Sequence, residues 1–299
     1  MSKPSLTDYA LLIGVGISWG SQFFFNQLAI KTLPPLLVAS GRVTIGCIFL
    51  TLLLRFLPKT DLNRESTSHP WGAYALIGIV EAILPCFLIP WGQQYVNASI
   101  AAILLAMVPI FTLILAPIFI AGEAWSRHAT LAVLLGFLGI VVLVDLWSQE
   151  RVAIHYWGEA AILGGALSFS VSMIMMKRLP DVAPVESIRN IFFTASIPLL
   201  TLAILWEHPW KLSPSSESLL AMITLGILCG GIAYVMFIRL LKRTGPTFTS
   251  LCNYLVTLSG VFLGVLVLED HLGIHDIFAL ILILAGLAVY QRRRAKLVI

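Results

Sequence analysis

Long apolar runs follow one another along almost the whole chain, and this feature limits the fold more than any other. Each run holds about 20 residues, enough to cross a hydrocarbon core of ~30 Å as a helix. Of the 299 residues, 59% are hydrophobic and only 11% are charged, too few to cover a surface that faces water. The sequence therefore predicts an all-α integral membrane protein and excludes an ordinary soluble enzyme.

Prolines, glycines and charge clusters divide the apolar sequence into ten predicted transmembrane helices. They cover residues 8–30, 34–57, 71–90, 98–121, 128–146, 157–177, 184–206, 218–241, 246–268 and 274–291. With the N-terminus in the cytoplasm, 14 of the 19 basic residues fall in cytoplasmic segments and three in outer segments. This bias predicts that both termini are cytoplasmic. The first apolar run continues without a cleavage signal, so no cleaved signal peptide is expected.

The two halves of the chain resemble each other. The matching features are GISWGSQFFF near residue 18 and GALSFSVSMI near residue 168, the turns Leu33-Pro34 and Leu179-Pro180, and the following Arg42 and Arg189. Each half contains five helices, an odd number, so the second half enters the membrane in the opposite orientation. The sequence thus predicts two inverted five-helix repeats, residues 1–147 and 148–299, an architecture found in many secondary transporters.

Several short motifs in the first half also form a familiar series. They are Trp19-Gly20-Ser21, the Leu-Pro-Pro turn followed by Arg42, the stretch Gln94-Tyr95-Val96-Asn97-Ala98-Ser99, Pro109, and Gly122-Glu123. With these motifs the chain resembles, over essentially its whole length, the EamA-type drug/metabolite transporter superfamily. The resemblance implies a ten-helix carrier of small solutes, similar to the YddG-like exporters of aromatic amino acids. The second half departs from the pattern where Phe169-Ser170 replaces Trp-Gly and where Asn253-Tyr254-Leu255 replaces a proline region.

Polar side chains recur at helical spacing in three of the predicted helices and could line a path for a solute. These are Ser18, Gln22 and Asn26 in the first helix, Ser168 and Ser172 in the sixth, and Thr249, Asn253 and Thr257 in the ninth. The alternative is that they bond to neighbouring helices and hold the bundle together, at about 0.6 kcal/mol each. We expect the amides Gln22, Asn26 and Asn253 to be the better candidates for the cavity, since an amide both donates and accepts.

Two opposite charges fall at similar depths of the predicted membrane. Arg42 lies some eight residues inward from the outer end of its helix, and Glu81 ten residues inward from the inner end of the next helix. We expect them to pair or to share one water-filled cavity, because an unpaired charge at mid-depth is costly. Arg42 would then bind a substrate carboxylate, while Glu81 binds an ammonium group or carries a coupling proton; alternatively, the two form a structural ion pair. Arg189 is a weaker candidate, because it could snorkel or pair with Glu186.

Aromatic residues form a second candidate group. Most tryptophans fall at predicted helix ends, as in an interfacial belt, whereas Trp19 and Tyr254 lie well inside their helices. Together with Tyr74 and Tyr234 they could offer stacking surfaces to an aromatic or amphipathic solute, or they could simply pack between helices.

The fifth and tenth predicted helices carry no strongly polar side chain at mid-depth. We expect them to lie outside the bundle, against lipid or, in a homodimer, against a second copy. Prolines and glycines mark helices 3, 4, 8 and 9 as candidate gates. The sequence gives no sign of a metal or cofactor site, because Cys47, Cys86, Cys229 and Cys252 stand in apolar segments without metal-binding spacing.

These features favour a secondary transporter of a small solute. Its direction and substrate, export of amino acids across the bacterial inner membrane, rest on the family resemblance alone. A carrier of drugs or nucleotide sugars is the alternative, although a nucleotide sugar needs more basic residues than Arg42 and Arg189 supply. A membrane-embedded enzyme or a channel is a remote alternative, since the sequence shows no catalytic motif, no selectivity-filter segment and no feature that suggests nucleic-acid binding.

Overall fold

The protein is an all-helical bundle throughout the part described by the computed structural model, residues 4–56, 69–120, 125, 127–144, 153–179 and 183–297. The first half contains α1 (Leu6–Gly20), α2 (Gln22–Ala29), α3 (Pro35–Phe56), α4 (Trp71–Gly78), the π-helix η1 (Ile79–Ile83), α5 (Leu84–Gly92), α6 (Ala98–Leu105), α7 (Val108–Phe119) and α8 (Arg127–Val144). The second half contains α9 (Ala153–Lys177), α10 (Pro184–Glu207), the 3-10 turn η2 (Pro209–Lys211), α11 (Ser216–Thr224), the π-helix η3 (Leu225–Ile232), α12 (Ala233–Thr249), α13 (Cys252–Val267) and α14 (Ile274–Leu297).

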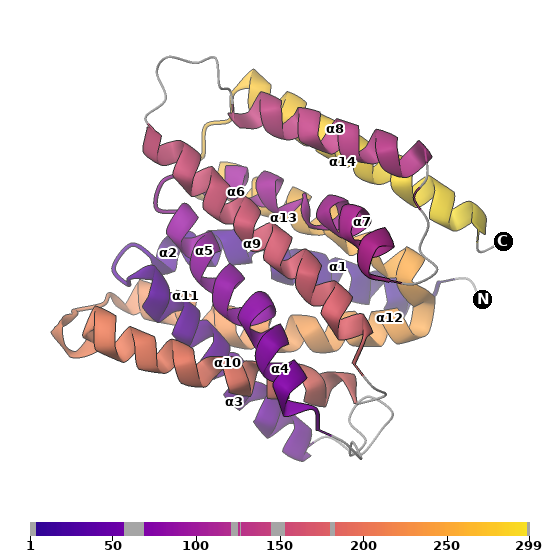
Figure 1. Ribbon diagram of the computed structural model, residues 1–299. Coiled ribbons are helices and arrows are strands. Elements are labelled where there is room, and N and C mark those ends of the chain that lie inside the picture. The colour runs from indigo at the N-terminus through magenta and orange to yellow at the C-terminus, as the bar shows by residue number, and fades with distance from the viewer. Residues whose placement is uncertain are drawn as a thin grey trace.

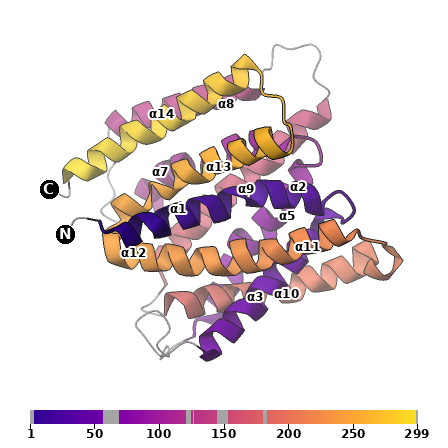
Figure 2. The same cartoon turned by 180° about the vertical axis from the view of Figure 1, so that it is seen from behind.

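Seven helical stretches in this part are long and apolar enough to cross a membrane. They are Pro35–Phe56, Trp71–Gly92, Ala98–Phe119, Arg127–Val144, His155–Lys177, Pro184–Glu207 and Ser216–Gly245. Two shorter apolar helices follow, Cys252–Val267 and Ile274–Val289, and the first predicted crossing is present as α1 and α2. The start of α1 and the end of α14 lie at the same end of the bundle (Figures 1 and 2), as an even number of crossings requires.

Four predicted helices are interrupted, which hydropathy alone could not reveal. The first breaks at Ser21, the fourth at 106–107, and the third and eighth each contain a π-helical segment, η1 and η3. The predicted ninth helix, 246–268, begins only at Cys252: the preceding helix is kinked at Gly245, which adopts φ 79° and ψ 175°, and a turn at 250–251 separates its last residues from α13. Of the sequence motifs described above, Gly122-Glu123 lies outside the described residues.

The helices form a main bundle with a separate pair on one side. Helices α8 and α14 pack against each other as a layer at the top of Figure 1, with apolar side chains such as Leu134, Phe137 and Phe278 exposed. From behind, α1 lies between α13 on one side and α11 and α12 on the other (Figure 2). Helices 5 and 10 of the sequence analysis therefore lie outside the main bundle, as we expected.

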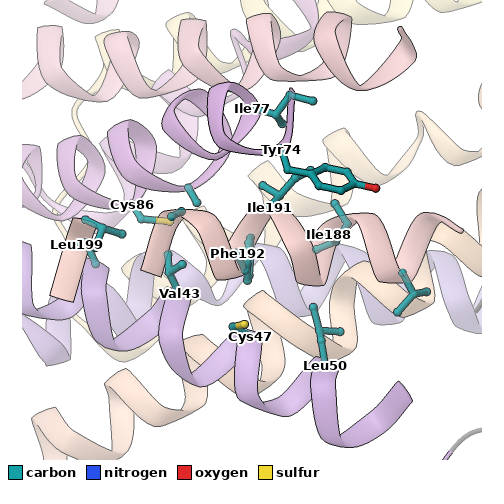
Figure 3. Packing of buried hydrophobic residues seen from close by; sticks show 14 of the residues in the cluster. Val43, Cys47, Leu50, Tyr74, Ile77, Cys86, Ile188, Ile191, Phe192 and Leu199 are labelled. Atoms are coloured by element: carbon teal, nitrogen blue, oxygen red, sulfur yellow. The ribbon is translucent and has the colours of Figure 1, made fainter. Parts of the chain in front are cut away.

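A large apolar cluster joins α3, α4 and α10 within the main bundle. Figure 3 shows Val43, Cys47 and Leu50 of α3 facing α10, which contributes Ile188 and Phe192. Burial in lipid gives such a core little hydrophobic driving force, so close packing of complementary surfaces must hold it together. The core therefore depends on shape, and small residues where helices approach closely become important.

Gly20, in the Trp19-Gly20-Ser21 motif, is at one such approach, between α1 and α13. A Cβ added there would lie 2.7 Å from the carbonyl oxygen of Val256 and 2.5 Å from the Cβ of Ser259. Neither neighbour is the end of a flexible side chain, so a larger residue would have to push the two helices apart.

We therefore predict that Gly20→Ala lowers the free energy of unfolding by about 1–3 kcal/mol, the usual cost of overpacking. Gly72→Ala is the matched control, because a Cβ at that helical position meets nothing within 4 Å, and we expect no loss there. Thermal unfolding of both variants in detergent tests this, and equal melting temperatures would contradict it.

Candidate functional site

Two buried charges of opposite sign lie close to each other inside the bundle. The side chain of Arg42 in α3 is 5% exposed, and its Nη2 donates to Oε1 of Gln22 at 3.0 Å. Glu81 is also 5% exposed, and its Oε1 accepts a hydrogen bond from the hydroxyl of Tyr234. The two charges interact electrostatically, but among the described ion pairs none joins them directly. We call Gln22, Arg42, Glu81 and Tyr234 the charge cluster.

Three of these four residues stand on interrupted helices. Gln22 is the first residue of α2, directly after the break at Ser21; Glu81 is in the middle of η1; and Tyr234 is the second residue of α12, directly after η3. π-Helical turns cost regular hydrogen bonding and occur often at functional sites. One such segment occurs in the third predicted crossing of each half, so the irregularity follows the repeat.

Each π-segment has a main-chain carbonyl bonded by a side chain from another helix. In η1 the carbonyl of Val80 accepts from the hydroxyl of Ser168 at 2.9 Å, and in η3 that of Cys229 accepts from Nε1 of Trp19 at 3.1 Å. Ser168 belongs to the second half and bonds to the first, whereas Trp19 belongs to the first half and bonds to the second. These hydrogen bonds satisfy polar groups that lipid cannot satisfy, and they join the two halves symmetrically.

Aromatic rings lie beside the charge cluster. The ring centroids of Trp19 and Tyr234 are 5.3 Å apart in an edge-to-face arrangement, and Phe237 and Phe192 extend the group at 5.1 Å from Trp19 and 5.7 Å from Tyr234. Of the four aromatic residues predicted to share a cavity, the structure brings Trp19 and Tyr234 together.

The other two predicted aromatic residues lie elsewhere. Tyr74 is buried against α10 in the apolar cluster that also holds Phe192, and Figure 3 shows it beside Ile188 and Ile191; its described ring contact is with Trp71, at 5.8 Å, and not with Trp19 or Tyr234. Tyr254 packs against a different apolar cluster, formed around α6, and its buried hydroxyl has no hydrogen-bond partner among the described residues. Neither side chain is therefore part of the aromatic group at the charge cluster.

Asn26 belongs to a network of amides that joins α2 to the end of α5. Its Nδ2 donates to Oε1 of Gln93 at 3.1 Å, and Nε2 of Gln93 donates to the carbonyl of Phe23 at 2.9 Å and to Oε1 of Gln27 at 3.2 Å. The sequence analysis missed Gln93, because a polar residue at the end of an apolar run is usually an interfacial residue. This network gives Asn26 the bundle-holding contact that was the alternative to cavity lining.

The remaining polar candidates differ in their relation to the charge cluster. Ser172 is fully buried one turn after Ser168, and it interacts with the Glu81 carboxylate without reaching hydrogen-bond geometry. By contrast, Nδ2 of Asn253 donates to the carbonyl of Ser250 in its own chain segment at 3.2 Å. Ser172 thus adjoins the site, whereas Asn253 makes a local hydrogen bond.

Arg189 does not join the charge cluster. Its Nη2 lies 3.4 Å from Oε1 of Glu186, three residues earlier on α10, and Nδ1 of His69 is 4.0 Å from the same oxygen. The structure therefore realises the pairing with Glu186 that the sequence offered as an alternative. The two halves are not equivalent in charge at this position.

Comparison with known proteins decides the family. The EamA-like transporter family matches residues 7–145 and again residues 156–291. The chain belongs to this family. As an EamA-like transporter it is a multi-pass membrane protein, and several of its relatives are named as transporters. The second match begins where the chain enters its second half, in keeping with a repeat.

Relatives of this transporter occur in several bacteria. The uncharacterized transporter YoaV of Bacillus subtilis is 20% identical over 92% of this chain and 94% of its own. The uncharacterized inner membrane transporter YedA of Escherichia coli is 24% identical over 88% of this chain and 83% of its own. Protein PagO of Salmonella typhimurium is 23% identical over 96% of this chain and 93% of its own. A protein of known crystal structure shares the fold with a TM-score of 0.65 at 22% identity, covering 94% of this chain and 97% of its own.

The described part of the transporter offers no group of three or more His, Cys, Asp or Glu side chains placed to hold a metal ion. The charge cluster and its neighbours offer a guanidinium, a carboxylate and the aromatic rings of Trp19 and Tyr234, and the two charged groups are buried. Such groups bind and orient a small polar molecule.

We predict that Asn26 and Gln93 are energetically coupled. Replacing either by leucine leaves the other amide buried without its partner, and each single variant should lose about 1–3 kcal/mol of unfolding free energy. The double variant should lose less than the sum, since the surviving amide is then removed as well. Equilibrium unfolding of the three variants in detergent measures the coupling, and strictly additive losses would refute it.

Proposed function

We propose that this transporter carries amino acids, including aromatic ones, out of the cell across the bacterial inner membrane. The observation that supports this most is the charge cluster: an arginine and a glutamate, both buried in the bundle and within electrostatic reach, that do not form an ion pair with each other. An amino acid has a carboxylate and an ammonium group on one carbon. These two groups match the two protein charges in sign.

We assign roles to the cluster on the same basis. Arg42 binds the carboxylate, because a guanidinium donates two parallel hydrogen bonds to that group. Glu81 accepts the ammonium group, or a coupling proton when transport is driven by a gradient. Trp19 and Tyr234 adjoin the solute's side chain, and an aromatic side chain gains stacking and edge-to-face contacts there. Ser172 completes the polar surface and Gln22 is bonded to Arg42 in the empty site, while Asn26, Ser168, Tyr74, Asn253 and Tyr254 support the bundle around it.

The distribution of basic residues argues against a nucleotide-sugar substrate. A nucleotide diphosphate carries at least two negative charges, which call for several cations in the site. Only Arg42 is in the charge cluster, and Arg189 is engaged by Glu186 at 3.4 Å. A cationic drug would use Glu81 alone and leave Arg42 unmatched.

Alternating access would use the interrupted helices. The break at Ser21 and the π-segments η1 and η3 adjoin or contain residues of the charge cluster, a further break lies at 106–107, and such irregularities are where helices bend. In this proposal both termini are cytoplasmic, and residues 1–147 and 148–299 are the two repeats that rock against each other. The exposed apolar face of α8 and α14 contacts lipid or a second copy in a homodimer.

We predict that Arg42→Lys reduces amino-acid uptake into proteoliposomes at least tenfold. Lysine keeps the charge but loses the forked donor, and a hydrogen bond between charged groups contributes about 1.5–3 kcal/mol. Arg189→Lys is the matched control, since that residue pairs with Glu186 outside the cluster, and its uptake should stay within about twofold of wild type.

Purified protein, a panel of labelled amino acids, and vesicles with and without a pH gradient make up the test. A gradient effect that disappears in Glu81→Gln assigns the coupling proton to Glu81. Movement of sugars, nucleotides or cationic drugs in place of amino acids would refute the proposed substrate and leave the family assignment intact.

A further inference from the structure

The two charges of the cluster each have a neutral hydrogen-bond partner, although an opposite charge is close by. Arg42 is bonded to the side-chain amide of Gln22 at 3.0 Å, and Glu81 to the phenol of Tyr234. A buried charge is most stable next to an opposite charge with good geometry. Holding the two charges apart, each with a weaker partner, is therefore not the arrangement that stability alone would favour.

The two neutral partners donate and accept hydrogen bonds as the two charged groups of an amino acid would. Gln22 presents a carbonyl oxygen to the guanidinium, as a carboxylate would. Tyr234 presents a hydroxyl hydrogen to the carboxylate of Glu81, as an ammonium group would. Each existing bond has only one charged partner, whereas a bond to the zwitterion would have two. The added Coulomb attraction, and the second parallel hydrogen bond that a carboxylate accepts from a guanidinium, would let a zwitterion replace both partners favourably.

We infer that Gln22 and Tyr234 are internal substitutes for the solute, which occupy Arg42 and Glu81 in the empty transporter and are displaced together by a zwitterion. This inference rests on the proposed function. It adds that the site selects a molecule with both charges, and that two named side chains compete with the molecule for its binding groups.

The positions of the two substitutes suit them for displacement. Gln22 begins α2 after a helix break, and Tyr234 follows the π-segment η3, so each can move through a local change at a helix irregularity. Tyr234 belongs to the second half, whereas its partner Glu81 belongs to the first. Displacing the tyrosine thus removes one hydrogen bond between the halves at the moment when the solute binds, and this links occupancy to movement.

The site should therefore discriminate by charge. With Arg42 and Glu81 both ionised, the cluster has no net charge, and a zwitterion keeps it neutral. An analogue without the ammonium group leaves Glu81 bonded only to Tyr234. One without the carboxylate leaves Arg42 bonded only to Gln22. We expect each analogue to bind at least tenfold more weakly than the parent amino acid, because it lacks one charge-assisted hydrogen bond to the protein.

The decisive experiment measures the Kd of an amino acid that the wild type transports, in Tyr234→Phe and in Gln22→Leu. The phenylalanine keeps the ring contacts to Trp19 and Phe192 and removes only the hydroxyl. If the substitutes compete with the solute, each variant should bind about threefold to tenfold more tightly, because no hydrogen bond has to be broken first. Tyr95→Phe is the control and should leave Kd unchanged, because this half-buried tyrosine packs edge-to-face on Trp91 outside the charge cluster.

The sign of the change decides between two roles. Weaker or unchanged binding in both variants would mean that Gln22 and Tyr234 bind the solute or only pack, and it would overturn the inference while wild-type transport still supports the proposed function. Absence of amino-acid uptake by the wild type would overturn the proposed function and the inference with it. Size-exclusion profiles like that of the wild type, together with the agreement of two variants on different helices, exclude misfolding as the cause.

Discussion

Main-chain groups inside a bilayer have no water to bond to, and the structure of this transporter depends on how it meets that constraint. Regular helices satisfy it alone, but a helix that bends must find a partner for each carbonyl it releases. Here the carbonyls of Val80 and Cys229 are bonded by Ser168 and Trp19 from the opposite half. The irregular segments that give the protein its bends are therefore the same places at which its two halves hold each other, and the charge cluster lies between them.

The second constraint is the cost of charge in an apolar surrounding. Arg42 and Glu81 could cancel that cost most simply by pairing, yet they are bonded to Gln22 and Tyr234. The amide and phenol reduce the cost without removing it, which leaves free energy available for a better partner. Arg189, by contrast, is matched by Glu186 within one helix turn and has the character of a structural residue. Two arginines at matching places in the repeat thus have different surroundings, and only their neighbours reveal this.

Hydropathy was sufficient to predict an all-helical membrane protein, because each apolar run had the length of a bilayer crossing. The rise per residue in a helix also placed Arg42 and Glu81 at similar depth. Other features depend on contacts between distant segments and leave no local signal. Nothing near Ile79 or Leu225 distinguishes a π-turn from an α-turn, and the hydrogen bond between Asn26 and Gln93 joins residues 67 positions apart. Asn253 satisfied the same amide pattern as Gln22, yet its side chain bonds to its own segment.

The four free cysteines are all buried, and two of them lie at the π-segments: Cys86 near the start of α5, which follows η1, and Cys229 within η3. A thiol that is enclosed in this way reacts with an alkylating reagent only when the surrounding helices part. The native chain thus contains its own chemical probes of opening. Protection of these thiols by a bound solute would be readable by mass spectrometry, without an engineered label and without knowing beforehand which molecule is carried.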